Sequence, residues 1–257
     1  TFTSITGQDN AKGRVTGHGF IKLTSFFHPE VDLQLQLDKL IVVQNDEISG
    51  KASGSLKLQG ALFGETNKAA KISGDVVLQP LEIHLEDHVE KVVTIQLLEK
   101  KKDGKYETAK EYRQQVEVQK DSVPIPLDII LRSPGNIYIR GYGLDAQWKG
   151  EMRALGVLSD PYLVGSLTLI HGKLDLLGKP LKLTEGKIGY TEIPKNDPLL
   201  AIVGTREVGE ITVIMSIDGH ASNPKIAFSS TPALPQEEVL ARLLFGRGVE
   251  SMSVTQS

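Results

Sequence analysis

Residues 31–38 read Val31-Asp32-Leu33-Gln34-Leu35-Gln36-Leu37-Asp38, an unbroken alternation of apolar and polar side chains. Successive side chains of an extended strand point to opposite faces, so this segment has one aliphatic face and one polar face. The same alternation recurs in residues 20–23, 56–58, 72–78, 81–85, 93–97, 137–139, 167–169, 174–176, 181–183, 211–217 and 226–228. The sequence therefore predicts an all-β fold of half-buried strands.

The composition narrows what the aliphatic faces can bind. The chain has 257 residues, long enough for one large β domain or two smaller ones, and is 40% hydrophobic but only 5% aromatic, with Trp148 the sole tryptophan. Sugar-binding clefts usually offer ring faces, whereas a wall of Leu, Ile and Val suits acyl chains. The formal net charge of -3 provides no basic field for nucleic acid.

Several classes of segment and site are missing from the sequence. There is no cysteine, which excludes disulfides, thiolate zinc sites and cysteine nucleophiles. No stretch reaches the ~18 apolar residues of a membrane span, and the densest apolar run is residues 199–203. No signal peptide opens the chain, which starts at Thr1 and stops after an amphipathic segment. We expect a piece of a longer protein.

Asp103-Gly104 is a strong signal for a two-residue hairpin turn. It separates residues 92–99 from residues 106–118, and both flanks are highly charged. We expect a hairpin near residues 92–118 that projects into water; a docking arm for a partner is the alternative.

A weak internal repeat links Gly54-Ser55-Leu56-Lys57-Leu58 to Gly165-Ser166-Leu167-Thr168-Leu169. We expect the glycine to turn the chain and the following residues to form a short strand. Such a repeat suggests successive addition of strands to one growing sheet.

Residues 231–248 carry the signals of one short amphipathic helix. Pro235 suits the first turn, Glu237 and Glu238 favour the positive end of the helix, and Gly246 suits its stop. Its apolar stripe either packs on the parent sheet or caps its end, or else it docks a partner. If the helix docks a partner, the docking candidates are Val239, Leu240, Leu243, Leu244 and Phe245.

Motifs for catalysis, metals and cofactors are weak or absent. Residues 141–146 match a loose dinucleotide fingerprint, but the segment that follows is too short for the required helix, so a tight turn or bulge is expected. His84 and His88 would lie roughly 13 Å apart on a strand, too far to share an ion. We expect no catalytic residue, no metal site, no cofactor and no enzymatic activity.

The amount of one-sided aliphatic surface poses a physical problem. About a dozen such strands, ~4.8 Å apart, would span roughly 55 Å in one sheet. Soluble proteins seldom expose so large an apolar patch, so the sheet must be covered by a second sheet, close into a barrel, or curl into a trough. The candidates for an aliphatic groove are Leu33, Leu35, Leu37, Leu56, Leu58, Ile137, Ile139, Leu167, Leu169, Ile226 and Phe228.

Three segments, in matching order and spacing, resemble the TamB family. Residues 133–150 resemble its "(V/I)RG-x-GLDAEW-x-G" segment, and residues 161–188 its "P-x-L-x-G-x-L … G-x-(I/F)" pattern. Residues 224–246 resemble its "P-x-I-x-FSS-x-P-x-LPQ-x-EVLA-x-LLFG" signature. The resemblance is specific over residues 124–248, while residues 1–123 belong by continuity.

The resemblance implies a mainly antiparallel sheet curled into a U-shaped trough, in the periplasm, within a full-length protein anchored in the inner membrane of a Gram-negative bacterium. It implies phospholipid transport to the outer membrane and assembly of outer-membrane proteins and autotransporters with a barrel partner. Unfolded outer-membrane proteins are further possible substrates. A pure docking scaffold or chaperone that acts by strand addition is the alternative. We divide the chain into a strand segment (1–123), a family-like trough segment (124–230), the helix motif (231–248) and a truncated tail (249–257).

Overall fold

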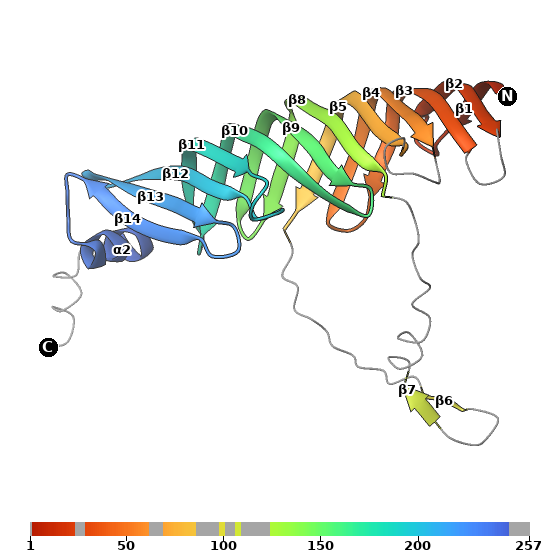
Figure 1. The fold of residues 1–257 in the computed structure, drawn as a ribbon. Coiled ribbons are helices and arrows are strands. Elements are labelled where there is room, and N and C mark those ends of the chain that lie inside the picture. Colours follow the sequence, from red (N-terminus) through yellow and green to blue (C-terminus); the bar gives the residue numbers. More distant parts are fainter. Residues whose placement is uncertain are drawn as a thin grey trace, which may run out of the picture. The chain divides into compact units, whose positions relative to one another are not determined.

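A computed structural model describes residues 2–23, 29–61, 69–85, 98–100, 106–108 and 124–246. The chain forms two compact units, one of residues 1–86 with 124–257 and one of residues 87–123. The larger unit contains one 12-stranded sheet in the order β1-β2-β3-β4-β5-β8-β9-β10-β11-β12-β13-β14 (Figure 1). These strands lie in the sheet in their order along the chain. Residues 87–123, between β5 and β8 in the sequence, form the second unit.

The strands of the sheet are long, which is why one-sided alternation is visible in the sequence. They are β1 (Phe2–Gln8), β2 (Arg14–Leu23), β3 (Pro29–Gln44), β4 (Ile48–Ala61), β5 (Lys71–His84), β8 (Pro126–Gly141), β9 (Leu144–Val157), β10 (Asp160–Leu176), β11 (Lys179–Tyr190), β12 (Leu199–Val208), β13 (Ile211–His220) and β14 (Lys225–Thr231).

Neighbouring strands of the sheet pair antiparallel, with one exception among the described residues: β5 and β8 pair parallel, from Ile72↔Leu127 to His84↔Arg140. The sheet is open and curled, with β1 and β14 at its edges. This confirms the predicted all-β, mainly antiparallel class with one short C-terminal helix. The parallel pair was not expected, because the alternation of side chains is the same in both kinds of sheet.

Two strands are longer than the sequence predicted. Residues 72–78 and 81–85 were expected as separate runs, but 72–84 lie in β5 with an irregularity between Val77 and Leu81. Residues 167–169 and 174–176 likewise lie in β10, with a register shift between Leu169 and His171. A β-bulge accommodates extra residues without ending a strand, so a break in the alternation is not a strand end.

The repeated glycines do not turn the chain, which corrects the expectation from the repeat. Gly54 lies inside β4 with φ +148°, and Gly165 lies inside β10 with φ +137°. A Cβ on Gly54 would collide with the backbone oxygen of Asp75 on the neighbouring strand. Glycine at this position therefore permits a close approach of two strands.

The helix α2 (Gln236–Phe245) confirms the predicted helix. Pro235 lies at the N-cap, one residue before the first turn, and Glu237 and Glu238 lie in that turn. Gly246 ends the helix in the left-handed conformation with φ 72°, and its N–H donates to the Arg242 carbonyl at 2.9 Å. This is the stop that a C-terminal glycine favours.

Most of the buried apolar side chains in the described residues belong to one of two clusters. The larger lies on β4, β5 and β8 to β12 and contains Trp148, whose side chain is 0% exposed. The smaller joins Ile211 and Val213 of β13 to Val239 and Leu243 of α2. The helix thus packs on one end of the chain's own sheet.

The second unit contains β6 (Leu98–Lys100) and β7 (Tyr106–Thr108), which pair antiparallel with Glu99 opposite Glu107. These strands lie within the two flanks of the hairpin expected near residues 92–118. Its turn at 103–104 and the outer parts of its flanks lie outside the described residues.

Candidate functional site

The aliphatic groove candidates share one face of the sheet, here called the inner face. In β3 and β4, Leu35 lies opposite Leu56 and Leu33 opposite Leu58. Strand pairing continues this face through Gly74 of β5 and Ile129 of β8, and onward to Trp148, Leu167, Ile188, Leu200, Ile217 and Ile226. Segments far apart in the sequence therefore form one continuous aliphatic surface.

Exposure divides the candidates into two groups. Ile137 and Leu167 are 0% and 2% exposed and belong to the core, and Leu37 and Ile139 are also buried. By contrast, Leu33, Leu35, Leu56, Leu58 and Leu169 are half-buried, Phe228 packs beside the α2 cluster, and Ile226 is 56% exposed. The inner face is thus accessible at β3, β4 and β14, and filled by the chain's own side chains in the middle.

Glycines on the inner face accommodate the bulky side chains opposite them. Gly74 lies opposite Leu56, and a Cβ there would come within 2.7 Å of Leu56 Cδ2. Gly17 lies opposite Leu35, with a corresponding distance of 2.6 Å to Leu35 Cδ2. Leucine side chains therefore spread across the neighbouring strand and make the wall continuous.

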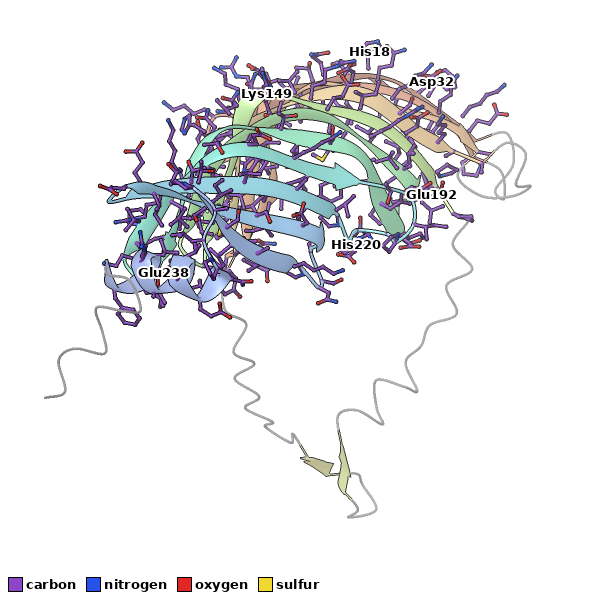
Figure 2. The ribbon with its side chains drawn as sticks, turned by 90° about the vertical axis from the view of Figure 1, so that its left-hand side faces the viewer. His18, Asp32, Lys149, Glu192, His220 and Glu238 are labelled. Carbon is purple, nitrogen blue, oxygen red and sulfur yellow. The ribbon has the colours of Figure 1, made fainter. Side chains whose placement is uncertain are left out.

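The opposite face of the sheet is polar. In Figure 2, His18, Asp32 and Lys149 point away from the hollow of the curled sheet. Across the parallel junction this face carries the ion-paired triplets Lys71–Asp128–Arg153, Asp75–Arg132–Glu151 and Glu82–Arg140–Asp145. The polar face thus adds side-chain contacts where β5 meets β8.

Asp128 has the most strongly shifted carboxyl group in this network. It accepts hydrogen bonds from Arg153 Nε at 2.6 Å and Lys71 Nζ at 2.8 Å. These two cations, Arg153 first, lower the pKa of Asp128 to about 2. The carboxylate is therefore ionised wherever the sheet is folded at neutral pH.

The docking candidates on α2 do not share one environment. Val239 and Leu243 are buried against Ile211 and Val213, as the packing alternative expects. Leu240 and Leu244 are half-buried, whereas Phe245 is 63% exposed. Of the stripe, Phe245 is the side chain most available to a partner.

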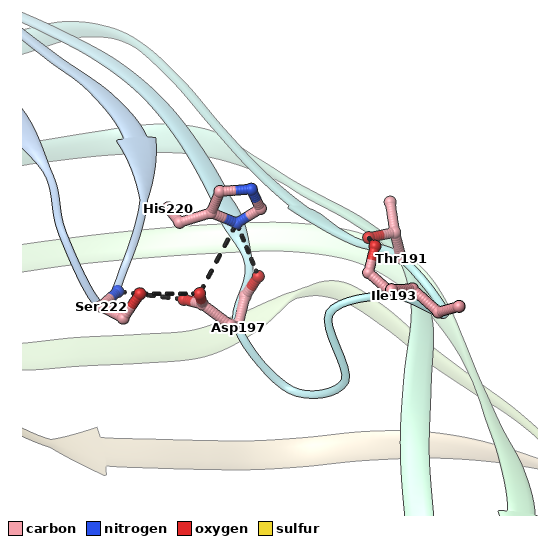
Figure 3. A network of polar contacts seen from close by, with 5 residues as sticks. All are labelled: Thr191, Ile193, Asp197, His220 and Ser222. Atoms are coloured by element: carbon pink, nitrogen blue, oxygen red, sulfur yellow. Dashed lines mark hydrogen bonds and ion pairs between the residues drawn. The ribbon is translucent and has the colours of Figure 1, made fainter.

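Asp197, His220 and Ser222 lie together, but not as a catalytic triad (Figure 3). The Ser222 hydroxyl donates to Asp197 Oδ2 at 2.7 Å, and His220 Nδ1 lies 3.1 Å from the Asp197 carbonyl oxygen. In the part of the chain described, no hydrogen bond joins Ser222 to His220, so the serine–histidine contact of a catalytic triad is not formed. The Ser222 contacts lower the pKa of Asp197, and the network ties the loop before β12 to the β13–β14 turn.

The weaker motifs have structural roles. Tyr142 and Gly143 form the tight turn between β8 and β9, with φ 50° and 81°, which confirms that the motif contains a tight turn; its residues 144–146 lie in β9. His84 ends β5, and His88 lies outside the described residues. Among the residues described, no three His, Cys, Asp or Glu side chains cluster as metal ligands. A surface hollow lined by His18, Gln34, Leu35 and Leu56 lies mainly on the polar face, because most of its lining residues point to that face.

Sequence reasoning missed two inner-face residues. Trp148 was noted only as a lone tryptophan, yet it lies opposite Ile137 and Leu169 at the centre of the core. Arg206 lies on the inner face opposite Val213, where alternation predicts an aliphatic side chain. The alternation of residues 137–139 could have been extended to Trp148; no sequence signal distinguished Arg206.

Comparison with known proteins places this architecture in a family. No helix in the described residues is long and apolar enough to cross a membrane. The translocation and assembly module subunit TamB of Haemophilus influenzae is 26% identical over 136 residues, which is 51% of this chain and 10% of that protein. The chain therefore spans only a small part of that relative's length. The family described as TamB C-terminal domain matches residues 3–257, and the chain belongs to this family.

Proposed function

We propose that this domain is a periplasmic segment of an inner-membrane-anchored envelope protein that shields phospholipid acyl chains on its inner face. In this role it supports phospholipid transport to the outer membrane and, with an outer-membrane barrel partner of the translocation and assembly module, the assembly of outer-membrane proteins and autotransporters. Family membership and the relative's printed name support a place in that module.

The observation that carries the proposal is the continuous aliphatic face that remains partly open. Leu33, Leu35, Leu56 and Leu58 form cross-strand pairs and are only half-buried. Water-exposed aliphatic surface of this extent is unfavourable for a soluble domain, and it usually marks a site that a ligand or partner covers. Acyl chains match a wall that lacks aromatic and charged side chains at these positions.

Leu35 offers the sharpest test, because it is half-buried and its neighbour Gln34 points to the polar face. Leu35→Asp would place a charge against bound acyl chains, which is strongly unfavourable, whereas Gln34→Asp adds the same charge on the solvated side. We expect phospholipid, measured by mass spectrometry of lipid extracts, to copurify with the wild type and Gln34→Asp but not with Leu35→Asp. Equal lipid in both variants would rule out the proposal.

A second candidate function is a docking scaffold that binds its partner by strand addition. β14 is an edge strand of the described sheet, and an edge strand offers unpaired backbone groups to an extended segment. If a barrel partner or an unfolded substrate adds to this edge, hydrogen exchange of residues 225–231 should slow when that protein is present. Unchanged exchange at β14 would count against strand addition.

A further inference from the structure

Arg206 places a cation on the aliphatic inner face. It lies in β12 directly opposite Val213 of β13, and Val213 is 0% exposed in the cluster beneath α2. Residues opposite each other in an antiparallel pair point to the same face of the sheet. The side chain of Arg206, which is half-buried, therefore lies on the same face as the groove candidates.

Among the residues that the structure describes, the Arg206 guanidinium donates a single hydrogen bond, at the point where strand pairing ends. The pairing between β11 and β12 ends at Lys182↔Thr205, so Arg206 follows the last paired residue. Its Nη1 donates to the Pro180 carbonyl at 3.0 Å. A guanidinium has five N–H donors, and this bond uses only one of them.

The charge of Arg206 is also unmatched within the described part of the chain. Arg132, Arg140, Arg153 and Arg242 each lie within 4.0 Å of a carboxylate, whereas no ion pair of the described residues includes Arg206. A cation beside aliphatic surface is costly unless an anion accompanies it. The planar fork of arginine suits a phosphate oxyanion, which it can bind through two parallel hydrogen bonds.

Accessible aliphatic side chains lie further along the same face. Ile202 is buried, but Ile217 opposite it is half-buried, and Ile226 opposite Ile217 is 56% exposed. Ile202 is four residues before Arg206 in β12, about 13 Å along the strand. On the other side of Arg206, Val208 packs beside the cluster covered by α2. Arg206 thus lies between the end of the face that α2 covers and the partly exposed side chains of Ile217 and Ile226.

We propose that Arg206 binds the phosphate group of an amphiphile whose acyl chains lie on Ile217 and Ile226. This inference rests on the proposed function, and it adds the position and orientation of the bound lipid: phosphate toward α2, chains along β13 and β14. The Arg206–Pro180 bond holds the guanidinium at the point where the strands part.

The intact chain can be tested by calorimetric titration with dioctanoyl phosphatidate, dioctanoylglycerol and glycerol phosphate. The first two share their acyl chains and differ in the phosphate, and the third carries the phosphate alone. We expect the wild type to prefer the phosphatidate over dioctanoylglycerol roughly tenfold or more, as a charge-assisted hydrogen bond supplies. Arg206→Gln should remove this preference and leave the affinity for dioctanoylglycerol unchanged.

Arg132→Gln on the polar face is the matched control and should keep the full preference. Arg206→Lys retains the charge without the fork; it should keep part of the preference, and it replaces Arg206→Gln as the test if that variant does not fold. Retention of the full preference in the Arg206 variant would overturn the inference, as would glycerol phosphate binding as tightly as the phosphatidate. If the wild type binds neither lipid, the proposed function itself fails; equal binding of both lipids refutes only the role of Arg206.

Discussion

The ring of Trp148 in β9 occupies the space in front of Gly186 in β11: a Cβ at position 186 would lie 2.9 Å from Trp148 Cη2. Leu169 of β10 lies between these two strands opposite Trp148, so the indole extends over a neighbouring strand. The middle of the inner face is closed by this arrangement of a large ring and a glycine.

Gly186→Ala should therefore destabilise the sheet. The added methyl group would lie 2.8 Å from Leu169 Cβ and 2.9 Å from Trp148 Cη2. These side chains or the backbone must therefore move, and overpacking of this kind costs about 1–3 kcal/mol. Gly189→Ala in the same strand is the control, because the nearest atom to its added Cβ would be 3.9 Å away. Urea denaturation should show a lower midpoint for Gly186→Ala alone; equal midpoints would contradict the packing of Leu169 and Trp148 against Gly186.

The two groups of groove candidates should differ in what they contribute to stability. Leu167 is 2% exposed in the core, and Leu167→Ala should cost roughly 2–5 kcal/mol through lost burial and a cavity. Leu35 is half-buried, so Leu35→Ala should cost clearly less. Denaturation curves of both variants measure this difference, and a larger loss for Leu35→Ala would show that β3 belongs to a closed core.

Asp128 should make the stability depend on pH below neutrality. Its folded-state pKa of about 2 lies below the ~3.9 of an unfolded aspartate, so the unfolded chain binds the proton more readily. The stabilisation is fully present above about pH 4 and is lost as the pH falls toward 2. Asp128→Asn should make the free energy of unfolding depend less on pH between about pH 4 and 2. A pH dependence identical to that of the wild type would refute the lowered pKa of Asp128.

Substitutions at Phe245 and Val239 should distinguish a role of α2 in partner docking from its role in folding. Phe245→Asp changes an exposed side chain and should leave the melting temperature nearly unchanged, whereas Val239→Asp buries a charge beneath the helix and should lower it strongly. If α2 docks the barrel partner, Phe245→Asp should weaken capture of that protein in a pull-down. Capture equal to the wild type would show that the exposed end of the helix is not the docking surface.

Much of the fold was predictable because it depends on a local period. The alternation in residues 31–38 determined the faces of β3, and Pro235 and Gly246 marked the ends of α2. The parallel junction of β5 and β8 was not predictable, since strand direction depends on contacts between distant segments. The role of Gly54 was misread because a glycine that permits close strand approach has the same sequence signature as one in a turn.

The sequence predicted on which face of the sheet the groove candidates lie, but not which of these side chains are accessible at the surface. Alternation identifies Ile137 and Leu35 equally, yet Ile137 is fully buried and Leu35 is half-buried. The difference arises from Trp148 and the strands that surround it, which lie far from residue 35 in the sequence. Arg206 could not be identified because only its partner Val213 fixes the face on which it lies.

The most direct test of an acyl-binding inner face is site-specific photocrosslinking at consecutive positions of β3. A photoreactive residue would replace Leu33, Gln34, Leu35 and Gln36 one at a time, and captured phospholipid would be identified by mass spectrometry. Because these side chains alternate between the two faces of the sheet, lipid should be captured at positions 33 and 35 and not at 34 and 36. Capture at all four positions alike, or only at 34 and 36, would contradict the account.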